Sequence, residues 1–212
     1  MFNCPKKRPA TYIQRSEKKI EASTFWDRLW HKGVGVLCRP SRVRRMRYHR
    51  YLVDIRQYAQ TLSTMSDAKL IELVGTVKEQ LVRGGYTKST LIEAFALIRE
   101  VSGRSVGMYH FDSQILGGLS LFFSDITEMQ TGEGKTLTAV LPAAAAALAD
   151  IPVHVVTVND YLAQRDVDLM RPVYEMLGLS VGCVIHGMTL EERQEAYACD
   201  VVYCSNKELV FD

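Results

Sequence analysis

Apolar residues recur at helical spacing in the first half of the chain. A helix is predicted between Ser66, a good N-cap residue, and the glycine pair at residues 84 and 85, because four apolar residues share one face: Leu70, Val74, Val77 and Leu81. A second helix is predicted to open at Thr90-x-x-Glu93, a capping box in which each side chain satisfies a backbone N–H of the first turn. This helix is expected to continue to Gly103.

From about residue 107, short apolar runs alternate with helical stretches. Strands are predicted at residues 126–129, 153–158, 181–185 and 200–204, and the second has the pattern of a buried strand. Between them, helices are predicted up to about Ala149, from Tyr161 to Leu177, and after the capping box Thr189-x-x-Glu192. Strands that alternate with helices across short loops indicate a parallel sheet, so we expect an α/β fold preceded by an α-helical N-terminal region.

Composition and length narrow the class of protein. The chain has 212 residues, 47% of them hydrophobic, which suits one globular domain or a smaller one with an appended region and excludes a disordered chain. The five cysteines contain no C-x-x-C pair, which excludes a disulfide scaffold or a zinc ribbon. We find neither a secretory signal nor an apolar run long enough to span a bilayer, and therefore expect an intracellular protein with reduced thiols.

Charge is distributed unevenly along the chain. Residues 1–50 hold 14 Lys and Arg against 3 Asp and Glu, whereas residues 51–212 hold 12 against 21. Within the basic part, an apolar group made of Phe25, Trp26, Leu29 and Trp30 is followed by six arginines between residues 39 and 50. Aromatic residues next to cations are typical of a segment that lies on an anionic membrane surface. A solvated basic tail and a nucleic-acid-binding patch are the alternatives.

The strongest chemical signal is the stretch Gly132-Glu133-Gly134-Lys135-Thr136, between a predicted strand and a predicted helix. Glycines allow the backbone to turn its N–H groups toward a phosphate chain, and the helix offers its positive N-terminus. Lys135 is expected to reach the β- and γ-phosphates of a nucleotide, and the Thr136 hydroxyl to bind Mg²⁺. The general pattern G-x-x-x-x-G-K-[ST] requires glycine at position 129, where this chain has Met129.

Four separated stretches resemble the SecA family, the ATPase motors of bacterial preprotein export. Residues 128–137 (EMQTGEGKTL) resemble the phosphate loop of that family, in which the first glycine is also replaced. Residues 107–114 (GMYHFDSQ) resemble its G-M-R-H-F-D-x-Q stretch, with Tyr109 in the place of the arginine. Residues 153–166 are similar to its motif Ia, and residues 200–212 to its A-D-I-T-Y-G-T-N-N-E-F-G-F-D stretch. The resemblance covers roughly residues 60–212, whereas residues 1–50 fit it poorly.

The resemblance implies a P-loop, RecA-like (DEAD-type) motor domain that binds ATP and Mg²⁺. The nucleotide would be held by Gly132, Glu133, Gly134, Lys135 and Thr136, with Thr136 as the metal ligand. The carboxamide of Gln114 would read the adenine edge, because it can donate and accept at once. Three regions are expected: a basic, aromatic-containing segment at 1–50, a helical region at 51–106, and the first part of nucleotide-binding domain 1 at 107–212.

By the same resemblance, the intact protein would couple ATP hydrolysis to the passage of unfolded preproteins through the Sec translocon channel. It would work at the cytoplasmic face of the inner membrane, which favours anionic lipid over nucleic acid as the partner of residues 25–50. The chain ends at residue 212, before the Walker B acids of the family, so we expect a fragment with no catalytic residue of its own that hydrolyses ATP poorly. A DEAD-type nucleic-acid helicase is the alternative, because it shares the phosphate loop and an adenine-reading glutamine.

Three further polar residues have more than one interpretation. His154 alternates with valines in a predicted strand, which favours a packed, hydrogen-bonded histidine over a ligand. Arg165 could contact phosphate, or form a surface ion pair with Asp166 or Asp168. His110 is expected to shape its loop and to take no part in catalysis.

Overall fold

The structure is a computed structural model of the chain, and it describes the backbone of residues 41–212 and the side chains from Arg47 onwards. The chain divides into two compact units, Met1–Arg47 and Tyr48–Asp212, and the architecture is that of the second unit. The aromatic group predicted at residues 25–30 lies outside the described residues. The domain boundaries at residues 50 and 106 stay predictions, although one helix, α2, runs through residue 50.

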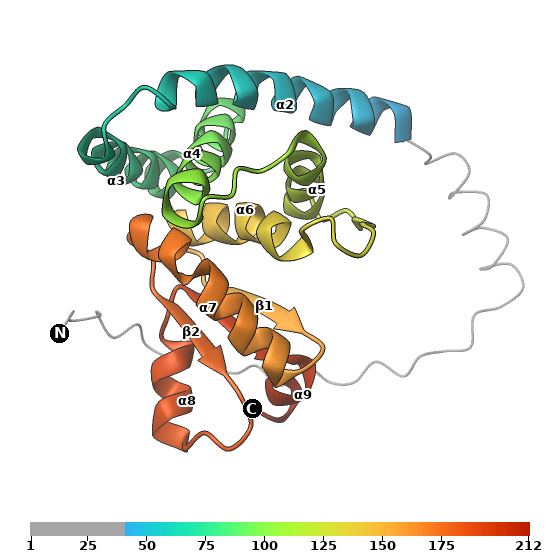
Figure 1. Cartoon of the computed structure of the whole chain (residues 1–212), viewed down its shortest axis with the longest axis vertical. Coiled ribbons are helices and arrows are strands. Elements are labelled where there is room, and N and C mark those ends of the chain that lie inside the picture. Colours follow the sequence, from blue (N-terminus) through green and yellow to red (C-terminus); the bar gives the residue numbers. More distant parts are fainter. Residues whose placement is uncertain (1–40) are drawn as a thin grey trace, which may run out of the picture. The chain divides into compact units, whose positions relative to one another are not determined.

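Four helices in the described part of the chain precede the glycine-rich loop at residues 132–134 (Figure 1). They are α2 (Ser41–Leu62), α3 (Asp67–Gly84), α4 (Lys88–Val106) and α5 (Asp112–Phe122). The prediction for α3 is confirmed, because Ser66 is its N-cap, the four predicted apolar residues are buried, and Gly85 follows its end with a positive φ. The capping box predicted for α4 is wrong. Thr87 is the N-cap and Thr90 its partner, so the helix begins at Lys88 and ends at Val106, before Gly107 in the left-handed region.

The α/β character predicted from residue 107 onwards is confirmed. A parallel three-stranded sheet has the order β1 (Val153–Thr157), β3 (Val201–Ser205), β2 (Val181–Val184), so the chain crosses from one edge to the other before it fills the centre. The helices of this part are α6 (Lys135–Leu148), α7 (Asp160–Met176), α8 (Leu190–Tyr197) and α9 (Asn206–Phe211). The predicted capping box of Thr189 and Glu192 forms, with both reciprocal hydrogen bonds.

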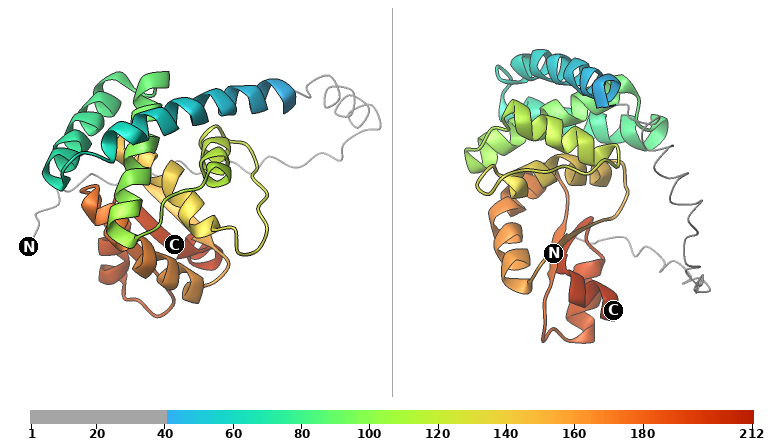
Figure 2. Two further views of the ribbon diagram at one scale, coloured as in Figure 1. Left: turned by 45° about the horizontal axis from the view of Figure 1, so that its top comes forward. Right: turned by 90° about the vertical axis from the view of Figure 1, so that its right-hand side faces the viewer.

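Helices α6 and α7 join the helical and sheet parts of this unit (Figure 2). Helix α6 packs against α4, α5 and β1, and α7 packs against α4, β2 and β3. Their apolar faces share one hydrophobic core, in which the hydroxyl groups of Tyr174 and Tyr203 lie 3.0 Å apart and form a hydrogen bond. No helix in the described part of the chain is long and apolar enough to cross a membrane.

The strand predicted at residues 126–129 is wrong. These residues form an irregular loop, in which Ile126 is fully exposed and the Thr127 hydroxyl donates to the backbone carbonyl of Gly117, 3.2 Å away. A strand needs a neighbour for its backbone N–H and C=O groups. Within the described residues, β3 pairs with β1 and β2, and no strand pairs with residues 126–129.

The buried pattern predicted for residues 153–158 is also wrong, although the strand itself forms. β1 is an edge strand of the described sheet, and its residues alternate between half-buried and exposed. Val153 and Val155 pack against the core, whereas Val156 is exposed. His154 is exposed as well, so its expected packed environment is not observed; its ring meets Tyr197 edge-on, with 5.7 Å between the ring centres.

Candidate functional site

The glycine-rich loop before α6 closes on itself through its own polar groups. Gly132 and Gly134 have φ values of +88° and +80°, in the left-handed region that glycine enters without strain. The backbone N–H of Gln130 donates to the Glu133 carboxylate across 2.7 Å, and the ammonium group of Lys135 donates to the Gln130 carbonyl across 2.9 Å. The loop thus holds one carboxylate and one cation within a few residues of each other.

Helix α6 begins directly at the end of this loop. Gly134 is its N-cap, and the first regular bond of the helix joins the N–H of Thr138 to the carbonyl of Gly134 across 2.9 Å. The amides of residues 135–137 therefore precede the helical hydrogen-bond ladder and form the positive end of the helix dipole. The first turn, all of it within the described part of the chain, contains no acidic residue, and Lys135 is exposed there. This terminus fits a phosphate group.

Gln114 connects α5 to the loop. Its side chain is 4% exposed, its Nε2 donates to the Glu133 carbonyl across 2.9 Å, and its Oε1 accepts from the N–H of Phe111 across 2.9 Å. Each carboxamide atom retains one further hydrogen-bonding position, a second N–H on Nε2 and a second lone pair on Oε1. The residues predicted to contact base and phosphate are therefore brought together, over a separation of 19 residues between Gln114 and Glu133.

Behind Gln114, His110 contacts the first turn of α6. Its side chain is buried, and its Nε2 lies 2.9 Å from the backbone carbonyl of Leu137. Burial lowers the pKa of His110 to about 4, although the contact with that carbonyl favours the charged form. The imidazole is therefore neutral near pH 7 and donates its Nε2 proton to Leu137. No local sequence pattern indicates this pair, because its members are 27 residues apart.

Met129 and Thr136, the two remaining positions of the motif, are both half-buried. A β carbon added to Gly117 of α5 would lie 3.6 Å from the sulfur of Met129 and 3.1 Å from a methyl carbon of Thr138. The side chain of Met129 therefore lies near Gly117 of α5, at a distance that is ordinary for van der Waals contact. Among the side chains that the structure describes, no three His, Cys, Asp or Glu residues are grouped to hold a metal ion.

The ion pair expected as one alternative for Arg165 is present. Its guanidinium group contacts Asp166 across 2.6 Å. A further polar group, which the sequence did not indicate, lies at the carboxyl ends of the strands, where open α/β sheets bind ligands. There Asp160 accepts from the backbone N–H of His186 across 2.8 Å, and its pKa is lowered by a hydrogen bond from Ser205 and by this backbone bond.

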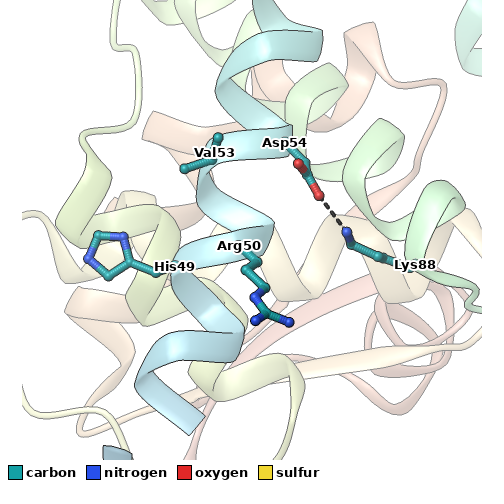
Figure 3. A pocket seen from close by; sticks show the side chains of 5 residues that line it. All are labelled: His49, Arg50, Val53, Asp54 and Lys88. Atoms are coloured by element: carbon teal, nitrogen blue, oxygen red, sulfur yellow. Dashed lines mark ion pairs between the residues drawn. The ribbon is translucent and has the colours of Figure 1, made fainter. Parts of the chain in front are cut away.

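A shallow pocket on α2 is lined by residues outside the glycine-rich loop. It is formed by His49, Arg50, Val53, Asp54 and Lys88, and Lys88 from the start of α4 reaches Asp54 across 2.6 Å (Figure 3). None of these five residues belongs to the phosphate loop or to the segment that carries Gln114. The pocket is therefore separate from the candidate site in the residues that form it.

Comparison with known proteins shows which family the chain resembles. The SecA DEAD-like domain family matches residues 35–212. Protein translocase subunit SecA 2 of Nitrosospira multiformis is 48% identical over 205 residues, which cover 96% of this chain and 30% of that protein. Protein translocase subunit SecA of Syntrophomonas wolfei is 53% identical over 148 residues, 70% of this chain and 18% of that protein. That of Anaplasma marginale is 46% identical over 168 residues, 79% of this chain and 19% of that protein.

The match to the Nitrosospira multiformis protein extends the expected resemblance toward the N-terminus. An alignment of 205 residues includes most of residues 1–50, which the sequence motifs alone had placed outside the resemblance. The chain spans less than a third of the length of these curated relatives.

Proposed function

The chain belongs to the SecA family, and on that premise we propose that it forms the part of a protein-export motor that binds ATP with Mg²⁺. One observation carries this proposal: Gln114 is hydrogen-bonded to Glu133, inside the glycine-rich loop that opens α6. A residue suited to read a base and a loop suited to hold phosphates are therefore parts of one site.

Each site residue receives a role from its position. The backbone of Gly132, Glu133 and Gly134 follows the phosphate chain, and the amides at the start of α6 complete the cradle. Lys135 turns from the Gln130 carbonyl to the phosphates, where its positive charge is better compensated. The Thr136 hydroxyl, one residue into the helix, is the protein's ligand to Mg²⁺.

Direct measurement of nucleotide binding tests this assignment. Calorimetric titration of the 212-residue chain with MgATP is expected to show one site, and Lys135→Ala is expected to weaken it at least tenfold, about 1.4 kcal/mol. Lys69→Ala removes an exposed lysine of α3 and serves as the matched control, with unchanged affinity. Absence of binding to the unaltered chain, or equal affinity of the Lys135 variant, would contradict the proposal.

For the intact protein we propose ATP-driven passage of unfolded preproteins through the Sec translocon channel across the inner membrane. The names of the three relatives support this function, because each is a protein translocase subunit and none is a nucleic-acid helicase. The decisive measurement uses the full-length protein. Its ATPase rate should rise with preprotein and channel and stay unchanged with RNA; stimulation by RNA alone would instead favour the DEAD-type helicase.

Hydrolysis by the 212 residues alone is proposed to be slow. Phosphoryl transfer to water needs a residue that positions the water and an acidic ligand for Mg²⁺. In the part of the chain that the structure describes, the only carboxylate bonded within the loop is that of Glu133, and it accepts from the loop backbone. MgATP binding with little phosphate release is the expected result, and turnover at a rate typical of motors, at least about 1 s⁻¹, would contradict it.

Residues 25–50 are proposed to bring the motor to the cytoplasmic face of the membrane by contacting anionic lipids. The support comes from the sequence, which places six arginines after an aromatic group, and each cation near such a surface contributes about 1 kcal/mol. Flotation with anionic and neutral vesicles tests this. Recovery should require anionic lipid and should fall at high salt, and equal recovery with both vesicles would contradict the electrostatic contact.

A further inference from the structure

The segment that carries Gln114 is bonded to the phosphate loop and its helix at two points. Nε2 of Gln114 donates to the carbonyl of Glu133, and Nε2 of His110 donates to the carbonyl of Leu137, each across 2.9 Å. These two carbonyl groups lie on either side of residues 134–136, which contain Lys135 and Thr136. The base-reading segment is therefore attached both before and after the residues proposed to hold phosphate and Mg²⁺.

His110 is also held from the opposite side, by α4. Arg99 donates from Nε to the backbone carbonyl of His110 across 3.1 Å. The same guanidinium group lies over the ring of Tyr109, 5.2 Å from its centre. The ring of Tyr109 in turn fills the space beside Gly103, where an added β carbon would lie 2.1 Å from it. His110 thus bridges α4, which supplies Arg99, and α6, which supplies Leu137.

The other ring nitrogen of His110 forms no hydrogen bond within the described residues. This atom, Nδ1, is buried. A buried polar atom without a partner is unfavourable, and most native structures contain few of them. An apolar side chain would avoid that cost, but it would also lose the bond to Leu137. Of the two ring nitrogens, Nε2 alone therefore links His110 to α6.

We propose that His110 is a positioning residue that fixes the distance between Gln114 and the phosphate-binding residues Lys135 and Thr136. The inference rests on the proposed function, because it concerns the same nucleotide site. With both attachments made, the base contact and the phosphate contact belong to one rigid body. When the phosphates of a nucleoside triphosphate are bound, its base can then contact Gln114 without a further loss of conformational entropy in the protein. The second contact therefore adds to the affinity, as in any ligand with two linked binding groups. His110 thereby supplies the preference for a nucleotide over a bare polyphosphate.

The test compares two ligands on the full 212-residue chain: MgATP, which has a base, and Mg-tripolyphosphate, which has none. His110→Ala is expected to weaken MgATP about tenfold and to leave tripolyphosphate within about twofold, because only the base contact depends on the attachment. His110→Gln should restore most of the preference, since its amide nitrogen can occupy the place of Nε2. Ile115→Val, a buried change in α5, serves as the packing control and should leave the affinity ratio unchanged.

Several outcomes would overturn this proposal. If His110→Ala weakens both ligands equally, the residue supports the fold alone. If the alanine variant does not fold, His110→Asn replaces it, because asparagine is polar and smaller but too short to bond Leu137; an unchanged ratio in that variant overturns the proposal. The proposed function fails in a different way, namely when the unaltered chain binds neither ligand.

Discussion

Gly134 and Gln114 are so close that a side chain at residue 134 would require the carboxamide of Gln114 to move. A β carbon at Gly134 would lie 2.3 Å from Nε2 of Gln114, and the backbone there has a φ of +80°. Two independent constraints therefore require glycine at this position, a backbone conformation and a close approach. At Gly132 only the first applies, because its φ is +88° and no atom lies within 4 Å of the added β carbon.

This difference predicts unequal effects of two similar substitutions. Gly132→Ala should cost about 1 kcal/mol of unfolding free energy, the strain of a left-handed alanine. Gly134→Ala should cost roughly 2–3 kcal/mol, because it also displaces the carboxamide of Gln114 from Glu133 and leaves the Glu133 carbonyl without that donor. Denaturant unfolding of the two variants measures both values. Equal costs would show that Gln114 moves aside without loss.

A second pair of glycines tests the packing between β2 and α8. A β carbon at Gly182 would lie 2.6 Å from the backbone carbonyl oxygen of Ala196, which cannot move without its helix. Gly182→Ala is therefore expected to lower the unfolding free energy by about 2–3 kcal/mol, as overpacking does elsewhere. Gly75→Ala is the matched control, because Gly75 lies inside α3 with open space around it; the melting temperature should rise, with a gain of about 0.5–1 kcal/mol. A neutral Gly182→Ala would mean that α8 is loosely held.

Local sequence signals predicted the start of a helix correctly where only one pair of residues could form the capping box. Thr189 and Glu192 formed the expected capping box, because all its atoms lie within four residues. Near the start of α4, Thr90 and Glu93 satisfy the sequence rule, but the helix begins three residues earlier, where Thr90 takes the place that Glu or Gln usually has in the box of Thr87. The strand expected at residues 126–129 depended on a partner strand elsewhere, which no local pattern reveals.

In the candidate site, too, the local motif was predicted from the sequence, whereas the contacts between distant residues were not. The motif of glycines, Lys135 and Thr136 predicted a loop that leads into a helix, because the known phosphate-binding motifs have those residue types in that order, and the loop and α6 are found there. The bond from Gln114 to Glu133 spans 19 residues and that from His110 to Leu137 spans 27, so both depend on how α5 packs on α6. The exposed position of His154 likewise follows from its place on an edge strand, which strand order alone determines.

Arg104 joins three helices, which predicts a large effect of its removal. Its guanidinium group donates to Glu100 in α4 across 2.8 Å, to Asp67 at the start of α3 across 2.7 Å, and to the carbonyl of Leu62 at the end of α2 across 2.9 Å. Glu100 is 2% exposed. Arg104→Met should lower the unfolding free energy by about 2–4 kcal/mol, because it leaves the Glu100 carboxylate buried without its cation. Urea unfolding measures this loss.

Two further variants distinguish the contribution of the buried ion pair to stability from that of an exposed ion pair. Adding Glu100→Gln to Arg104→Met should recover part of the loss, because the unpaired charge is removed together with its partner. Arg83→Met breaks an exposed pair with Glu79 in α3 and should cost no more than about 0.5 kcal/mol. If Arg104→Met were as mild as Arg83→Met, water would be reaching Glu100.

The buried His110 predicts a specific pH dependence of stability. Its pKa is about 4 in the folded chain, below the ordinary value near 6.5 in the unfolded chain. Between these values the unfolded chain binds more protons, so stability is complete above pH 6.5 and falls as the pH is lowered toward 4. The full difference corresponds to a loss on the order of 3 kcal/mol. Unfolding free energies measured by denaturant titration at steps from pH 7.5 to pH 4 give this curve.

The variant His110→Gln isolates this contribution from that of the carboxylates. Asp160, whose pKa is lowered, loses its stabilising contribution only as the pH falls below its ordinary value near 3.8, and it does so in both proteins. Subtraction of the variant's curve from that of the unaltered chain should therefore leave only the histidine, with a slope confined to pH 4–6.5. Parallel curves would show that His110 has the same pKa in the folded and the unfolded chain, which would require water to reach its Nδ1.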